Sequence, residues 1–343
     1  MVFRFLEAQK MNQRVIANLQ QLRTDYAKIT GREFSYFYCP ILFKDENKPL
    51  CEAHIINKAF DNAARVTTVQ RRDVDSFYGS RFESDFLDVQ EHRKRSLAEI
   101  ATDKLLSKRF DAKLFCDGEP VEPIFARDGI PPQFTPIDLG QVKLSVPFGL
   151  KMEPAEVIAS AGKRWEISIQ RDLRIPMLVS AIKAAHLTLF QMLGYRYALS
   201  LAGHFVGYDI LGKFFEENHT KKKTEVLRSA APFFREFGNM VRPVISMPFD
   251  SAGSIKDKTF LMCVGSSGTV WGFIVFVKTA HLNHGVLMPV FEEAEQAVTY
   301  LNFLKNENSA IQVAGCRFKG DGWERDDKTI PLVWPKKGLL YPE

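Results

Sequence analysis

The stretch between residues 33 and 90 constrains the fold more than any other part of the chain, because its apolar spacing changes from strand-like to helical within a short distance. Residues 33–43 (EFSYFYCPILF) and 50–56 (LCEAHII) are aromatic and branched, and the turn-forming run KDENKP separates them. Together they predict a β-hairpin over residues 34–56. From residue 73 to residue 90, apolar side chains recur along one helical stripe. A compact unit of two strands and a helix is therefore expected here.

The remaining patterns divide the chain into further segments. Residues 1–32 predict a helix, and residues 111–175 predict a β-rich segment punctuated by prolines. Residues 176–245 are expected to be helical, with Pro176 at the first helical position and Gly194 at the end of the first helix. Residues 246–343 combine strand-like runs with an amphipathic helix at 292–308. The expected fold class is α+β: a ββα module at residues 33–110, a helical middle, and a C-terminal antiparallel sheet with a covering helix.

The composition excludes a disordered chain and leaves the partner open. The 343 residues are 45% hydrophobic and 25% charged, which is typical of a globular protein with at least one full core. The 46 Lys and Arg side chains exceed the 41 Asp and Glu side chains by five, so an anionic partner is permitted but not required. No Walker-type loop, GxGxxG or GxSxG element is present, which weighs against P-loop NTPases, Rossmann enzymes and α/β hydrolases.

Cysteine usage and hydropathy indicate the compartment. The five cysteines are an odd and irregularly spaced set, unlike a disulfide framework, and favour a reducing environment. The first ten residues carry charges where a signal sequence has its apolar run, and no window approaches 18 consecutive apolar residues. We expect a cytoplasmic protein without membrane association.

The residues that bear chemistry lie between Tyr38 and Asp85. His54 is followed by two isoleucines at the end of a predicted strand, ahead of a loop and a helix. CEAHIINKAF and DVDSFYGSRFE resemble the HNH endonuclease (ββα-metal) family, whose pattern includes Glu-His-Ile-Ile-Pro and Cys-Asn-x-x-Phe-Gly-x-x-x-Glu. The resemblance covers about 50 residues. It implies that His54 is the general base that takes a proton from water, and that Asp75 occupies the position of the family's Asn.

A carboxylate site for a hard cation is expected on the helix. Asp75, Gly79 and Glu83 are four residues apart, so the two carboxylates share a face with a gap between them, and Asp73 is an alternative ligand. Such ligands suit Mg²⁺ or Mn²⁺. The alternatives are a first-turn acid favoured by the helix dipole for Asp75, a helix N-cap for Asp73 and a solvated face for Glu83.

Phosphate contacts are predicted from three arginines beside this helix, because guanidinium groups match phosphate oxygens. They are Arg71, Arg72 and Arg81. Ordinary surface arginines are the alternative. His54 also has an alternative role, as a hydrogen-bonded core residue.

The chain departs from the family pattern at its zinc ligands. Of the four cysteine positions only Cys39 is retained, because Leu42, Arg71 and Val74 occupy the others. The residue before His54 is Ala53 instead of an acid. Structural zinc is therefore not expected, and a compensating site built from Cys39, Cys51 and His54 lacks an evident fourth ligand.

Two functions follow from these observations. The first is a metal-dependent nuclease that hydrolyses phosphodiester bonds, with DNA favoured over RNA, by analogy in bacterial defence. The second is a non-catalytic protein whose degenerate module binds nucleic acid or a protein. A protein partner or a homo-oligomer is compatible with both.

Overall fold

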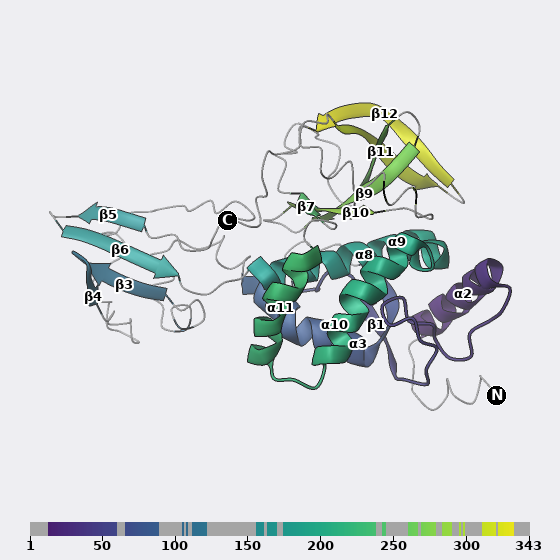
Figure 1. Cartoon of the computed structure of the whole chain (residues 1–343), viewed down its shortest axis with the longest axis horizontal. Helices are drawn as coiled ribbons and strands as arrows, with labels where there is room; N and C mark the ends of the chain where they lie inside the picture. Colours follow the sequence, from purple (N-terminus) through teal and green to yellow (C-terminus); the bar gives the residue numbers. More distant parts are fainter. Residues whose placement is uncertain are drawn as a thin grey trace.

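The computed structural model describes the helical body and three antiparallel sheets, and all structural statements below concern these residues. They are residues 13–59, 66–88, 105, 108, 112–121, 156–160, 163–169, 174–237, 242–244, 260–266, 269–278, 283–289, 295, 298, 311–319 and 322–332. Helices and strands are mixed (Figure 1), which agrees with the expected α+β class at this coarse level.

The first part of the chain forms helix α2 and a small ββα unit. Its elements are α2 (Gln13–Thr30), β1 (Leu50–His54), β2 (Thr67–Arg71), α3 (Arg72–Tyr78) and the π-helix η1 (Gly79–Glu83). A further helical turn runs to residue 88. The predicted helix at 73–90 is therefore present as far as it is described, with a π-helical segment that the sequence did not reveal.

The predicted hairpin over residues 34–56 is wrong. β1 pairs with β2, for which no strand was predicted, and residues 33–43 contain no strand. Only an isolated bridge joins Tyr38 to Asp45. Pro40 lacks the N–H that a strand requires. Five apolar side chains of this run are buried in the core instead of alternating between two faces: Phe34, Phe37, Cys39, Ile41 and Leu42.

The middle of the chain is helical from Arg174 to Phe237, whereas residues 242–244, which were predicted to belong to the helical segment, form a strand. It comprises α8 (Arg174–Ala198), α9 (Leu201–His204), the π-helix η2 (Phe205–Gly212), α10 (Lys213–Asn218) and α11 (Lys223–Phe237). α8 breaks at Gly194, where φ is 61°. A Cβ at this position would lie 2.1 Å from Oδ2 of Asp25, the atom that accepts a hydrogen bond of 2.7 Å from the backbone N–H of Tyr195. Gly194 therefore lets α2 approach α8 closely.

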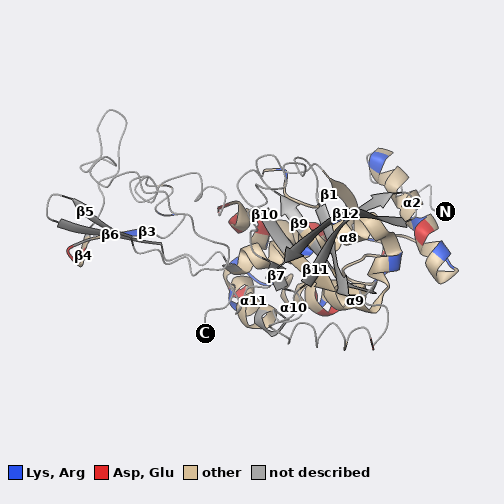
Figure 2. Ribbon diagram, turned by 90° about the horizontal axis from the view of Figure 1, so that it is seen from above, with Lys and Arg blue, Asp and Glu red and all other residues tan. Residues whose placement is uncertain are grey.

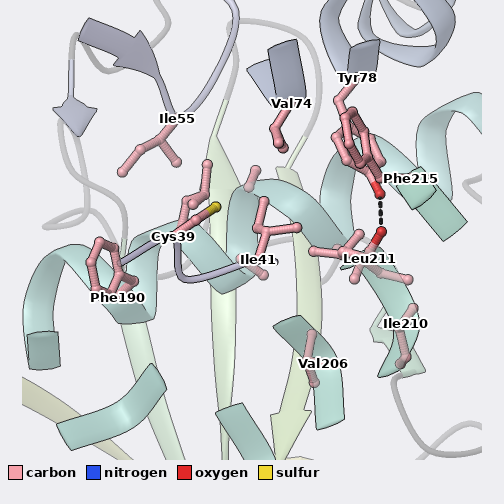
Figure 3. Packing of buried hydrophobic residues seen from close by; sticks show 14 of the residues in the cluster. Cys39, Ile41, Ile55, Val74, Tyr78, Phe190, Val206, Ile210, Leu211 and Phe215 are labelled. Carbon is pink, nitrogen blue, oxygen red and sulfur yellow. Dashed lines mark hydrogen bonds between the residues drawn. The ribbon is translucent and has the colours of Figure 1, made fainter. Parts of the chain in front are cut away.

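One hydrophobic core joins residues 15–86 to residues 177–234, which are separated in sequence by the β-rich segment. Figure 3 shows side chains from both parts in contact, with the Tyr78 hydroxyl donating a hydrogen bond of 2.6 Å to the Leu211 carbonyl. The predicted boundaries at residues 110 and 176 therefore do not separate independent cores. The segment before residue 110 and the segment after residue 176 share one core.

The two remaining sheets are antiparallel, which was predicted for the C-terminal sheet. A four-stranded sheet in the order β4-β3-β6-β5 contains β3 (Ala112–Cys116), β4 (Glu119–Val121), β5 (Glu156–Ser160) and β6 (Lys163–Ile169). The six-stranded sheet in the order β12-β11-β8-β9-β10-β7 contains β7 (Arg242–Val244), β8 (Phe260–Ser266), β9 (Thr269–Lys278), β10 (Asn283–Pro289), β11 (Ile311–Lys319) and β12 (Gly322–Leu332).

The six-stranded sheet packs against α8 (Figure 1), and Val275, Val286 and Met288 from its strands belong to the common core. The predicted covering helix at residues 292–308 lies outside the described residues except for 295 and 298. The helix that covers this sheet in the described part is α8.

Helix α8 also bears on the expectation that the protein is not a membrane protein. In the part of the chain that the structure describes, Ile175–Ala198 is the one helix whose length and composition would suffice to cross a membrane. Most of this segment is buried within the fold, as is common for a core helix of a soluble protein. This helix therefore does not indicate a membrane location.

Candidate functional site

The two carboxylates that the sequence assigned to a metal are brought together, but they meet a lysine. Lys183 Nζ lies 2.7 Å from Glu83 Oε1 and 3.0 Å from Asp75 Oδ1. The Lys183 side chain is fully buried, Glu83 exposes 10% of its side chain, and Asp75 exposes 31%. We call these three residues the Lys183 cluster.

The local fold explains why the two carboxylates converge. Asp75 lies in the first turn of α3, and Glu83 ends η1. Lys183 approaches from α8, 108 residues after Asp75. A Cβ built on Gly79, between the two acids in sequence, would have no other atom within 4 Å. The predicted gap on this helix face is therefore present, and α8 supplies the cation beside it.

Electrostatics hold Lys183 in its charged form. Burial lowers the pKa of an ammonium, but the charges of Glu83 and Asp75 and their hydrogen bonds outweigh burial and raise the pKa of Lys183 well above its usual value. A divalent ion between the same two oxygens would have to displace this ammonium. The residues therefore do not fit a metal ion while Lys183 is in place.

The wider surroundings agree with that conclusion. Among the residues that the structure describes, no group of three or more His, Cys, Asp or Glu side chains is arranged to hold a metal ion. Dependence on Mg²⁺ or Mn²⁺ thus stays a prediction.

Asp73 and Arg71 form a second ion pair. Arg71 Nη2 and Nε donate to the two carboxylate oxygens of Asp73 at 2.6 and 3.1 Å, and Nη1 donates to Glu46 Oε2 at 2.5 Å. Burial opposes the ionised form of Asp73, but Arg71 outweighs it and holds the pKa of this carboxyl below its usual value. The Arg71 side chain is only 5% exposed, so these contacts favour a structural role over phosphate binding.

The other two arginines are more accessible. Arg72 is exposed, and Arg81 is half-buried with Nη2 donating to the Lys221 carbonyl at 3.1 Å. That bond joins η1 to the loop between α10 and α11, where Lys221 and Lys222 are exposed. We call Arg81, Lys221 and Lys222 the basic cluster.

His54 lies at the end of β1, as the sequence predicted, and its side chain is half-buried. Side chains alternate along a strand, so Cys51 and Ala53 share one face of β1 and Glu52 and His54 share the other. Cys51 Sγ lies 3.9 Å from Asp75 Oδ2, which places Asp75 on the face opposite to His54. His54 therefore does not share a face of β1 with Asp75, and its role as a base remains a prediction.

The two cysteines considered for zinc both contact Gln70. Cys39 Sγ donates to the side-chain oxygen at 3.2 Å, and Cys51 Sγ donates to the backbone carbonyl at 3.6 Å. Burial raises the pKa of Cys39 to about 11, and burial together with Asp75 raises the pKa of Cys51 to about 12. Both thiols are therefore protonated near neutral pH in the metal-free protein.

Lys183 is the site residue that the sequence analysis missed. A signal was available, since a lysine stands among apolar residues in the run LVSAIKAAHLTLF. A charged residue at an otherwise buried helical position requires a partner of opposite charge. The sequence did not identify that partner, because the acids lie 100 and 108 residues earlier.

Comparisons of this chain with protein-family models, with curated proteins and with solved structures found no match.

Proposed function

We propose that this chain binds nucleic acid through the basic cluster, and that residues 50–88 serve as a non-catalytic scaffold for that surface. The observation that carries the proposal is the Lys183 cluster, in which a buried ammonium takes the position expected for a metal ion. Because both carboxylates pair with Lys183, the ββα unit lacks the free negative charge needed to hold a catalytic cation. Its fixed geometry can still position a surface that binds nucleic acid.

The basic cluster supports the second half of the proposal. Arg81 and Lys221 come from segments 140 residues apart and are held together by a hydrogen bond to backbone. Lys223, the residue after Lys222, does not belong to the basic cluster, because it pairs with the buried Asp85 at 2.5 Å. This ion pair fixes the loop between α10 and α11 against the segment that follows η1. Figure 2 marks basic residues beside α11. Cations on the protein surface can contact a phosphate backbone, and such contacts carry no base information.

Binding to a fluorescently labelled DNA duplex, measured by anisotropy at several salt concentrations, tests this proposal. The double variant Arg81→Gln with Lys222→Gln should weaken binding on all sequences and flatten its salt dependence, because two phosphate contacts are lost. Lys28→Gln is the matched control, since Lys28 is exposed on α2 at the other end of the helical body (Figure 1). Equal binding by the double variant and the control would contradict the proposal.

A metal-dependent nuclease is the second candidate. It is favoured by the succession β1, β2, α3, with His54 at the end of β1. Plasmid nicking with Mg²⁺ or Mn²⁺ by the wild type, abolished by His54→Ala without loss of DNA binding, would establish this function and refute the non-catalytic scaffold. The expected loss of turnover is about 10²–10⁴-fold.

A further inference from the structure

A chain of four half-buried rings crosses the surface between the 39–44 turn and η2. The ring centroids of Tyr38 and Phe43 are 6.0 Å apart, those of Phe43 and His204 are 4.7 Å apart, and those of His204 and Tyr208 are 5.4 Å apart. We call these four residues the aromatic strip. Each is partly exposed, so the strip is not simply an extension of the core.

Phe43 is held in a conformation that a phenylalanine rarely adopts. Its φ is 55°, in the left-handed region where a side chain is unfavourable and glycine is not. The turn requires this conformation, because the N–H of Phe43 donates to the Cys39 carbonyl at 2.8 Å and the N–H of Cys39 donates to the Lys44 carbonyl at 3.1 Å. Glycine would satisfy the turn at lower cost. The backbone conformation therefore does not explain why this position carries a phenylalanine. Strained residues of this kind cluster at functional sites.

The turn that carries Phe43 is fixed firmly against η2. A Cβ at Gly207 would lie 2.5 Å from the Pro40 carbonyl oxygen, and a Cβ at Gly212 would lie 2.4 Å from the Ile41 carbonyl oxygen. His186 Nε2 donates to the same Pro40 carbonyl at 3.0 Å. The two glycines permit the close approach and the histidine secures it, so the strip is held in place before any partner binds.

Two lysines flank the strip, and each pairs with a carboxylate that also contacts a ring of the strip. Asp209 Oδ2 lies 3.4 Å from His204 Nδ1, and Glu216 Oε2 accepts from the Tyr208 hydroxyl at 3.5 Å. Lys213 Nζ lies 5.7 Å from the centre of the Tyr208 ring and pairs with Asp209, and Lys44 pairs with Glu216. The lysine side chains are 47–50% exposed, whereas the two carboxylates are 31–32% exposed. The lysine side chains are thus more exposed than the carboxylates that pair with them, and a phosphate could compete for them.

We propose that the aromatic strip binds unpaired bases of single-stranded nucleic acid, with Lys44 and Lys213 contacting the adjacent phosphates. Rings beside cations are the combination that single-strand-binding surfaces use, because every base has a face that can stack on an aromatic side chain. This inference rests on the proposed nucleic-acid binding and goes beyond it by naming a second surface and the strand state that it selects.

The variant Phe43→Gly separates recognition from folding. Glycine relieves the strained φ while the ring contacts are lost, so the unfolding midpoint should stay close to that of the wild type. Affinity for a labelled oligothymidylate of 20 nucleotides, measured by anisotropy, should fall by about 5- to 100-fold. Tyr208→Leu should also weaken this binding. Ile29→Ala, which trims an exposed apolar side chain on α2, should leave it unchanged.

The duplex and single-strand measurements together distinguish the possible failures. If the wild type binds duplex and oligothymidylate and Phe43→Gly changes neither, the aromatic strip is not a base-binding surface, while the proposed function stands. If the wild type binds neither form, the proposed function fails and the inference fails with it. If Phe43→Gly converts an oligomer into a monomer without altering DNA binding, the strip is an interface between copies, and the proposal is overturned.

Discussion

Replacing Lys183 with methionine should destabilise the protein strongly, because the two carboxylates of the Lys183 cluster would lose the ammonium that they share. Methionine is similar in size to lysine and keeps the buried space filled. Breaking a buried ion pair from one side costs about 3–5 kcal/mol of unfolding free energy. Asp75 exposes 31% of its side chain, so water offsets part of this cost and we expect a value of about 3 kcal/mol.

Urea denaturation at pH 7, followed by circular dichroism, measures this loss directly. The matched control is a triple variant in which Lys183→Met is combined with Asp75→Asn and Glu83→Gln. It removes all three charges and should recover most of the stability. A loss below about 1 kcal/mol for Lys183→Met alone would show that water already compensates the carboxylates, and the reasoning on burial would be refuted.

The pH dependence has a definite sign. The pKa of Lys183 is raised above its usual value of 10.5, so its contribution to stability is fully present below about pH 10.5 and is lost only as the pH rises through the raised pKa. Between pH 6 and 9 the difference between wild type and Lys183→Met should be constant. Mg²⁺ should stabilise this variant and not the wild type, because only the variant has two uncompensated carboxylates. Equal stabilisation of both proteins would favour the nuclease candidate.

Three further predictions concern zinc, acid stability and packing. Elemental analysis of the purified protein should show no stoichiometric zinc, and one zinc per chain that is lost on Cys39→Ser or Cys51→Ser would overturn this expectation. Burial lowers the pKa of His186 to about 4 from 6.5, so the unfolded state binds more protons between these values, and the wild type should lose about 3 kcal/mol of stability from pH 6.5 to pH 4. Denaturant titrations of His186→Gln should lack that component, and an equal loss would assign it to other groups. Tyr78→Phe should cost about 1–3 kcal/mol in the same assay at pH 7, because the Leu211 carbonyl loses its donor in the core, and an unchanged midpoint would contradict this role.

The helices were predictable from sequence because their signals are local. Pro176 and Gly194 mark the first helix of the middle segment, and the structure places a helix across them with its break at Gly194. The apolar stripe of residues 73–90 likewise identified α3 and η1. Periodicity, caps and breakers act within a few residues, so one sequence is sufficient to read them.

The pairing of strands was not predictable in the same way. Residues 33–43 have strand-like composition, yet most of their apolar side chains are buried in the core beside α8 and η2. Conversely, TTVQR forms β2 despite its weak apolar pattern. The candidate site shows the same limit. The spacing of Asp75 and Glu83 was read correctly, whereas Lys183 enters from a helix 100 residues away. Tertiary contacts of this range leave no periodic trace in the sequence.

The shared core of residues 15–86 and 177–234 has a consequence for synthesis of the protein on the ribosome. Chains grow at about 5–20 residues per second, so residue 198, the end of α8, is added roughly 5–20 seconds after residue 88. During this interval the apolar side chains of α2, β1 and α3 have no partner helix, and Asp75 and Glu83 have no ammonium. Chaperones and proteases therefore meet residues 15–86 as an incomplete core, and slower translation between residues 88 and 198 lengthens that exposure. A chain released before α8 is complete should be degraded instead of accumulating as a folded fragment.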